Sequence, residues 1–241
     1  MLNLHAAPFS TDERRGIYRA IYERRDVRSH FLPTPIPKEV LGRILDAAHH
    51  APSVGFMQPW DFIIIQDESV RRAVHVNFER SNQQAAAIYQ GERRVQYYSL
   101  KLAAILEAPV NLCVTCDHQR RKGSGLGRQS DFATDLYSTV CAVQNLWLAA
   151  RAESLGVGWV SILDTQDLKK LLGIPARCTA VAYLCIGYVS EFLSQPELER
   201  KGWEHRESLA RLIHFDRWGA QDESRAAAFI VDLEERSTAT K

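Results

Sequence analysis

Three segments of the sequence carry side chains that could bind an anion or take part in catalysis. The first is ERRDVRSHF at 23–31, which places Arg24, Arg25 and Arg28 around one carboxylate, Asp26. Guanidinium groups match phosphate oxygens in shape and in charge, so this segment could hold a phosphate. A solvated basic end of a helix would also explain the arginines, but neither interpretation explains why an acid lies among them.

The second segment is APSVGFMQPW at 51–60, where proline and glycine break a helix before a strand begins. Its Ser53, Gly55 and Gln58 offer polar side chains and backbone groups beside which a planar ligand could lie. An ordinary turn between a helix and a strand is the alternative interpretation. The segment therefore indicates a binding site only in combination with the others.

The third segment is GVGWVSIL at 156–163, in which Gly156 and Gly158 let the backbone approach a neighbouring group closely. Ser161 follows them on a predicted strand, where a serine usually has a satisfied hydroxyl group. No G-x-S-x-G pattern surrounds Ser161, so a hydrolase triad is not indicated. GSGLGR at 123–128 opens no predicted helix, which argues against a dinucleotide-binding turn of the Rossmann type.

Composition and charge limit the class of protein. The 241 residues carry a net charge of +1 and are 46% apolar, so no long-range field draws this globular chain to nucleic acid or acidic membranes. No apolar run approaches the roughly 20 residues of a membrane span, and no secretory signal pattern is present, so we expect a cytoplasmic protein. We expect the five cysteines to be buried free thiols and no metal to be bound, because CVTC at 113–116 lies in a predicted strand.

Periodicity and breaker residues predict the elements that would position these segments. Helices are predicted at 10–25, 36–52, 68–108, 133–156 and 164–174, with short helices in the tail, and strands at 61–67, 109–117, 157–163 and 178–189. Ser10 begins the first helix in a capping-box pattern, and Gly156 is expected to close the long one. The chain is thus predicted to form one α+β domain, with a mixed or antiparallel central sheet flanked by helices.

The predicted helix at 133–156 is apolar on more than one face, so we expect a homodimer in which a second subunit covers it. The three segments and the late HRESL…HFDRWG tail together resemble the FMN-dependent nitroreductase-like fold, over residues 12–219. The resemblance implies a domain shared across a homodimer, with FMN between the subunits. The sequence pattern of residues 220–241 predicts a C-terminal helix and a frayed tail. The cofactor contacts that it implies are Arg24, Arg25, Asp26, Val27, Arg28, Ser53, Gly55, Met57, Gln58, Val160, Ser161 and Arg206.

The segments ERRDVRSHF, HHAPSVGFMQPW and GWVSIL are also similar to one family of this fold, the BluB-type 5,6-dimethylbenzimidazole synthases. Ordinary nitroreductases usually have Ser where this chain has Asp26. The similarity implies that reduced FMN is a substrate, which reacts with molecular oxygen and is broken apart to yield the lower ligand of cobalamin. It also implies that Asp26 and Ser161 are catalytic, and that a separate flavin reductase supplies free FMNH2.

Within this resemblance, Asp26 would be a general base, a role typically worth about 10²–10⁴-fold in rate. We expect the surrounding arginines to lower its pKa and keep it ionised. Ser161 would hydrogen-bond the edge of the flavin. The region 68–108 and its tyrosines could form a lid over the flavin, although a helix pair that spans the dimer is the alternative.

Two other functions remain open. A conventional NAD(P)H-dependent nitroreductase or dehalogenase of the same fold would consume NADH and keep FMN intact over many turnovers. A non-catalytic flavin carrier would return FMN unchanged after reduction in air, and it would have no use for an acid among phosphate-binding arginines. The sequence leaves open the flavin affinity, the order of the steps and the orientation of the Asp26 carboxylate.

Overall fold

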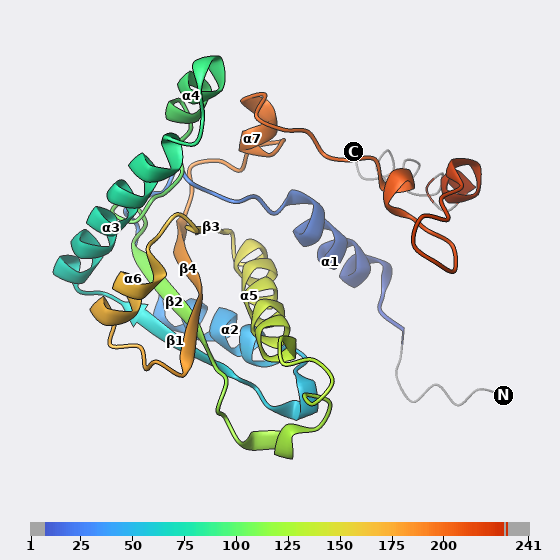
Figure 1. The fold of residues 1–241 in the computed structure, drawn as a ribbon, viewed down its shortest axis with the longest axis horizontal. Helices are drawn as coiled ribbons and strands as arrows, with labels where there is room; N and C mark the ends of the chain where they lie inside the picture. The colour runs from blue at the N-terminus through green and yellow to red at the C-terminus, as the bar shows by residue number, and fades with distance from the viewer. Residues whose placement is uncertain (1–7, 229, 231–241) are drawn as a thin grey trace. The chain divides into compact units, whose positions relative to one another are not determined.

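The fold is known from a computed structural model, which describes residues 8–228 and residue 230. The chain forms two compact units, Met1–Glu197 and Leu198–Lys241. The helices and 3-10 turns before their boundary are α1 (Thr11–Glu23), α2 (Lys38–His49), η1 (Val54–Phe56), α3 (Glu68–Ala86), α4 (Gly91–Tyr98), η2 (Lys122–Gly125), α5 (Thr134–Ala152) and α6 (Thr165–Leu171). The strands are β1 (Trp60–Ile65), β2 (Val110–Asp117), β3 (Leu155–Trp159) and β4 (Cys178–Tyr188), and α7 (Glu197–Arg200) and η3 (Leu209–Leu212) follow (Figure 1).

The four strands form one antiparallel sheet in the order β1-β2-β4-β3. β2 lies in the interior, where Cys113 pairs with Ile63 of β1 on one side and with Tyr183 of β4 on the other. A single parallel bridge joins Asp26 to Val157 at the outer edge of β3. The predicted α+β fold, with a central sheet flanked by helices, is confirmed.

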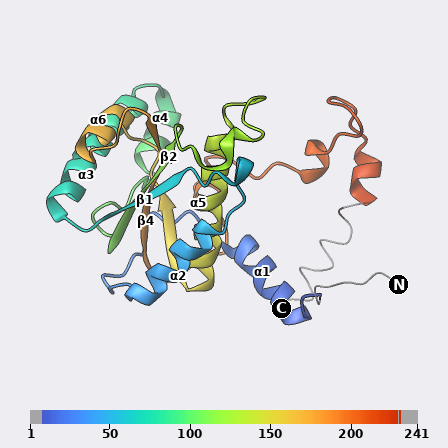
Figure 2. The ribbon, with the colours of Figure 1, turned by 90° about the horizontal axis from the view of Figure 1, so that it is seen from below.

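Helices cover both faces of the sheet (Figure 2). Strand side chains alternate between faces, so Leu112 and Val114 of β2 point to one apolar cluster and Cys113 points to the other. The first cluster includes Ile44 of α2 and Leu146 of α5, and the second is covered by α3 and α6. Burial of these two apolar layers stabilises the sheet, and the sheet in turn positions the site.

The start of α1 agrees with the sequence, and the end of α5 does not. Ser10 and Glu13 form the predicted capping box at the start of α1. The prediction that Gly156 closes the long helix is wrong, because α5 ends at Ala152 and Gly156 lies inside β3. Ser154 instead takes the left-handed conformation, with a φ of 61°, that turns the chain into β3.

The region 68–108 is helical only in α3 and α4, so the prediction of helix throughout is wrong at 87–90 and after Tyr98. The guanidinium group of Arg71 in α3 donates to the backbone carbonyls of Ile105 and Ala108. These carbonyls therefore have partners without a helix, and the chain can turn directly into β2. A role of this region as a lid stays a prediction.

One side of α5 remains exposed in a single chain. Tyr137, Val140 and Cys141 lie on this exposed strip, away from the helix face that packs on the sheet. The expectation that every cysteine is buried is therefore wrong for Cys141, while the other four are buried. The strip is the kind of surface that a second subunit could cover, and the homodimer stays a prediction.

Among its described residues, the second unit contains most of α7, the turn η3 and a helical stretch at 223–228. Its η3 is a single 3-10 turn where the sequence suggests a short helix, and the Arg225 guanidinium lies 3.9 Å from the Phe215 ring centre. Most of the predicted last helix falls on residues outside the described ones, and the predicted boundary between 12–219 and 220–241 stays a prediction. None of the helices in the described residues is both long and apolar enough to cross a lipid bilayer.

Candidate functional site

The arginine-rich segment leaves α1 and runs beside β3. The Val27 amide donates to the Val157 carbonyl at 2.9 Å, and the indole N–H of Trp147 in α5 donates to the Arg25 carbonyl at 3.2 Å. A Cβ atom on Gly158 would lie 2.0 Å from the Val27 carbonyl oxygen. Position 158 of β3 therefore requires glycine, because the backbone of the arginine-rich segment packs directly against it. This backbone is the neighbouring group whose close approach the sequence predicts.

Asp26 lies at the bridge between this segment and β3. Its Oδ1 accepts a hydrogen bond from the backbone N–H of Trp159 at 3.0 Å, and its Oδ2 pairs with the guanidinium group of Arg28. The Asp26 side chain is still 29% exposed, whereas that of Arg28 is 14% exposed. The Trp159 amide and the Arg28 guanidinium thus fix the orientation of the Asp26 carboxylate, which remains accessible to solvent.

Burial raises the pKa of Asp26 above its ordinary value. The Arg28 guanidinium, the Trp159 amide and Arg24 each lower the pKa, but together they do less than desolvation does. The arginines thus act in the expected direction, but the expectation of a lowered pKa is wrong, because desolvation outweighs them. The raised pKa makes the ionised carboxylate a stronger base than an ordinary aspartate.

The three arginines of the segment have different partners. The Arg24 guanidinium lies 5.0 Å from the ring centre of Trp147, in a cation–π contact. Arg25 donates to three backbone carbonyls, one of them at Ser194 at 2.5 Å, so a phosphate would compete with the protein for these donors. Arg28 holds the neighbouring carboxylate, and phosphate binding by all three stays a prediction.

β3 ends at Trp159, so the predicted strand at 157–163 is wrong in its second half. Val160 is buried, and the exposed Ser161 begins a turn in which its carbonyl accepts from the Leu163 amide at 3.0 Å. Ser161 thus lies two residues beyond the amide that binds Asp26. The structure brings the two predicted catalytic residues to the same end of β3, and their roles stay predictions.

The 53–58 loop is a tight turn that follows α2. The Ser53 hydroxyl accepts from the Gln58 amide at 3.0 Å, which closes the turn. Gly55 and Gln58 both have positive φ, at 53° and 49°. The Met57 side chain is buried, at 3% exposed, whereas Ser53 and Gln58 are partly exposed.

The sequence analysis missed the residues that support this loop. The segment 118–128, between β2 and α5, places the Lys122 ammonium group against the Gln58 side-chain oxygen and 4.5 Å from the Phe56 ring centre. Arg120 donates to the Gln58 carbonyl at 2.7 Å. Three closely spaced glycines among basic residues are the only sequence signal that this segment offers.

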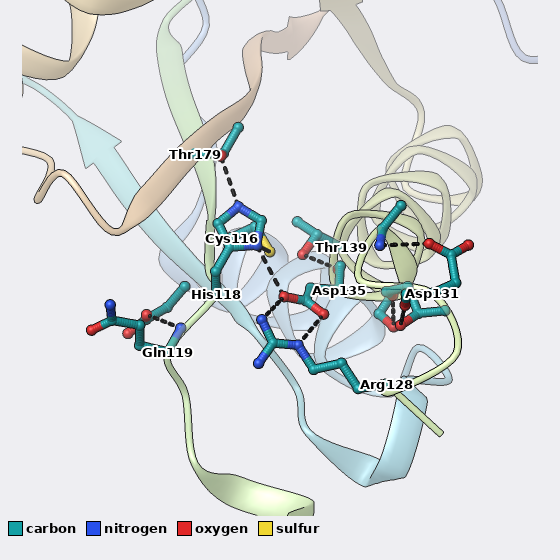
Figure 3. A network of polar contacts seen from close by, with 12 residues as sticks. Cys116, His118, Gln119, Arg128, Asp131, Asp135, Thr139 and Thr179 are labelled. Atoms are coloured by element: carbon teal, nitrogen blue, oxygen red, sulfur yellow. Dashed lines mark hydrogen bonds and ion pairs between the residues drawn. The ribbon is translucent and has the colours of Figure 1, made fainter. Parts of the chain in front are cut away.

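A second missed group surrounds Asp135, at the start of α5 (Figure 3). Its carboxylate is 0% exposed and accepts from Nε and a terminal nitrogen of Arg128 at 2.9 and 2.8 Å. His118 Nδ1 lies 2.9 Å from the same carboxylate, and His118 Nε2 lies 2.8 Å from the Thr179 hydroxyl. A carboxylate can only accept, so Nδ1 is the nitrogen that carries the proton.

Cys116, His118 and Asp135 place a sulfur, a nitrogen and an oxygen within 4.8 Å of one another. These are metal-ligand atoms, but two features oppose a bound cation. The positively charged Arg128 already binds both oxygens of Asp135. Burial also raises the pKa of the Cys116 thiol to about 11, and the thiolate is the form that binds metals. We assign no metal to this cluster.

The two predicted flavin-binding segments lie at opposite ends of α5. The Ser138 hydroxyl accepts from the Val54 amide at 3.0 Å near one end, and Trp147 donates to Arg25 near the other. At 1.5 Å per residue, these contacts are about 14 Å apart along the helix axis. One chain therefore does not bring the two segments together, and Arg206 belongs to the second unit, where its role stays a prediction.

Comparison with known proteins decides the family. Residues 21–188 match the model of the Nitroreductase family. The chain belongs to the nitroreductase family. A 5,6-dimethylbenzimidazole synthase from Rhodospirillum rubrum is 46% identical over 198 residues, which cover 82% of this chain and 93% of that protein. Another from Rhodobacter capsulatus is 41% identical over 197 residues, covering 81% and 94%.

These relatives confirm the resemblance to the synthases and the prediction of an oxidoreductase of the nitroreductase family. Among solved structures, oxidized iodotyrosine deiodinase bound to FMN and 3-iodo-L-tyrosine has a TM-score of 0.65 and 24% identity. The match covers 83% of this chain and 100% of that chain. It shows that the nitroreductase fold seen here is one in which another protein binds FMN.

Proposed function

We propose that the protein makes 5,6-dimethylbenzimidazole by oxygen-dependent fragmentation of reduced FMN. The two synthases at 46% and 41% identity support this reaction for their relative. The structural observation that carries the proposal is Asp26, a partly exposed carboxylate with a raised pKa among arginines. An enzyme that only passes electrons through FMN has no need for a base at this position.

Asp26 is proposed to act as the general base that removes protons from the flavin substrate during fragmentation. Its raised pKa strengthens it as a base, and the contacts to Arg28 and the Trp159 amide fix the direction of its carboxylate. A positioned base of this kind contributes about 10²–10⁴-fold in rate. Ser161, at the same end of β3, is proposed to hydrogen-bond the flavin edge.

The residues present fit a flavin nucleotide that is shared by two chains. Guanidinium groups suit the phosphate, and a turn with exposed polar groups suits the ribityl chain and ring. The proposed contacts are Arg24, Arg25, Val27, Arg28 and Arg206 around the phosphate and ribityl chain, and Ser53, Gly55, Met57, Gln58 and Val160 around the ring. Since the two segments lie at opposite ends of α5, a homodimer would supply the missing half of each site.

Reduced FMN is both the bound flavin and the substrate in this proposal, and molecular oxygen is the second substrate. The reaction consumes one flavin in each turnover, so a separate flavin reductase must supply FMNH2. This supply sets the proposal apart from an NAD(P)H-dependent nitroreductase, which regenerates its own bound flavin. Purified protein should accordingly convert FMNH2 without any nicotinamide.

The test mixes purified protein with excess chemically reduced FMN, admits air, and separates the products by chromatography. The expected result is 5,6-dimethylbenzimidazole from the wild-type protein, and FMN binding without product from Asp26→Asn. Asp46→Asn makes the same chemical change at an exposed carboxylate of α2 and should leave the yield unchanged. Recovery of all the flavin as intact FMN would refute the proposal, and NADH oxidation with intact FMN would favour the conventional reductase.

A further inference from the structure

We propose that Asp135 is a positioning residue for the 53–58 loop. The inference rests on the proposed function, because that loop is proposed to contact the flavin. Asp135 acts at a distance, through the segment 118–128 that connects β2 to α5. The Asp135 carboxylate binds His118 and Arg128, the two ends of this segment. The middle of the segment contacts the 53–58 loop.

The first step is the attachment of the segment to α5 (Figure 3). Arg128, at one end of the segment, forms a bidentate ion pair with both oxygens of Asp135, at 2.9 and 2.8 Å. His118, at the other end, donates to the same carboxylate at 2.9 Å. Because the carboxylate is fully buried, it needs both partners, and removal of its charge would release both ends together.

The second step is the contact between the segment and the loop. A Cβ atom on Gly123 would lie 1.9 Å from the Gly55 carbonyl oxygen, and one on Gly55 would lie 2.7 Å from the Leu126 carbonyl oxygen. The two backbones therefore touch directly, with no side chain between them. Lys122 adds a contact to the Gln58 side chain, so a shift of the segment would shift the loop with it.

The third step places the loop and the carboxylate on one piece of helix. Ser138 follows Asp135 by three residues in α5, and its hydroxyl accepts from the Val54 amide at 3.0 Å. The loop is thus attached to α5 directly at one point and through the segment at another. Asp135 thereby orients groups of the loop that would meet the flavin, without touching the flavin itself.

The first test measures FMN affinity by quenching of flavin fluorescence. Asp135→Asn keeps the size of the side chain and removes its charge, and it should raise the Kd for FMN at least tenfold. The matched control is Tyr183→Phe, which removes a buried hydrogen bond to Asn111 at 2.8 Å on the opposite face of the sheet. If Tyr183→Phe lowers the melting temperature as much as Asp135→Asn does, it should still change the Kd for FMN less than twofold. A Kd for Asp135→Asn within twofold of wild type would overturn the inference.

The second test moves the loop without touching Asp135. Gly123 and Gly125 both have positive φ, at 78° and 73°, so alanine strains the backbone equally at both. Only at Gly123 would the added Cβ strike Gly55, since the nearest atom to a Cβ on Gly125 is 4.0 Å away. Gly123→Ala should therefore weaken FMN binding about as much as Asp135→Asn does, and Gly125→Ala should not. Equal Kd values for the two alanine variants would contradict the inference, even if Asp135→Asn fails to fold.

These measurements also separate this inference from the proposed function. A wild-type protein that binds FMN but forms no 5,6-dimethylbenzimidazole would refute the proposed reaction and leave the affinity comparison decisive. A wild-type protein that forms product, with an Asp135→Asn variant that binds FMN normally, would refute the positioning role alone. Failure of the wild-type protein to bind FMN at all would refute both.

Discussion

Asp26 and Asp135 are two carboxylates that each pair with an arginine, and their surroundings differ in one decisive way. Asp135 is fully buried, and Arg128 and His118 together satisfy both of its oxygens. Asp26 is 29% exposed, with Arg28 on one oxygen and a single backbone amide on the other. Burial raises the pKa of Asp26 despite these donors. A neighbouring arginine therefore does not by itself decide the direction of the Asp26 pKa shift, because desolvation outweighs it.

The largest effect expected from this comparison is on the rate. Asp26→Asn should lower the initial rate of 5,6-dimethylbenzimidazole formation by about 10²–10⁴-fold, because the amide cannot act as a base. The measurement is the rate of product formation from FMNH2 in air-saturated buffer at saturating flavin. A fall of less than threefold, in a variant that still binds FMN, would remove Asp26 from the reaction.

The next effect is on stability, and it should be larger at the other carboxylate. Asp135→Ala leaves the charge of Arg128 and the Nδ1–H of His118 facing a cavity, so the free energy of unfolding should fall by about 3 kcal/mol. Asp26→Ala should cost much less, because desolvation already disfavours the ionised carboxylate. Urea denaturation of both variants at neutral pH measures the difference. Equal losses of stability would show that the two carboxylates are not distinct in the way described above.

A smaller loss of stability should follow from a substitution that displaces the Asp26 backbone and leaves Asp26 itself in place. Gly158→Ala places a Cβ atom 2.0 Å from the Val27 carbonyl oxygen, so the segment must shift, at a cost of about 1–3 kcal/mol. Gly42→Ala in α2 is the control, since a Cβ atom there meets nothing within 4 Å and alanine favours helix by about 0.5–1 kcal/mol. Thermal unfolding should show opposite signs for the two variants. Product formation should fall only for Gly158→Ala.

The smallest effect is a dependence of stability on pH. The folded-state pKa of Asp26 is raised, so the folded protein binds this proton more tightly than the unfolded chain does. The contribution of this group to stability is therefore fully present below the unfolded pKa and is lost as pH rises through the folded pKa. Relative to wild type, Asp26→Asn should accordingly be more stable at neutral pH than at pH 4. A difference that is constant over this range would show that the pKa is not raised.

The sequence predicts the elements well where local patterns decide them. The capping box at Ser10 and the apolar run that forms β2 need no tertiary information, and both appear as expected. The end of α5 was missed because the left-handed turn falls on Ser154 and not on the nearby Gly156. Glycine has two uses, and the sequence alone does not tell a helix end from a close contact between strands.

The candidate site also has a part that the sequence predicted and a part that only the fold shows. Asp26 and Ser161 could be named from the resemblance, but the direction of the Asp26 pKa shift could not, because desolvation depends on packing that no local pattern shows. Asp135 and His118 are 17 residues apart in sequence and carry no motif. They meet only because β2 and α5 pack together, so their network is visible in the fold alone.

The parallel bridge between Asp26 and Val157 also has a consequence for aggregation. β3 is one of the two edge strands of the sheet, and an open edge strand can pair with a strand of another molecule. The arginine-rich segment occupies part of that edge with its own backbone and lines it with charge. A variant in which this segment detaches from β3 should therefore be prone to aggregation as well as inactive. It should precipitate during refolding at protein concentrations at which the wild-type protein stays in solution.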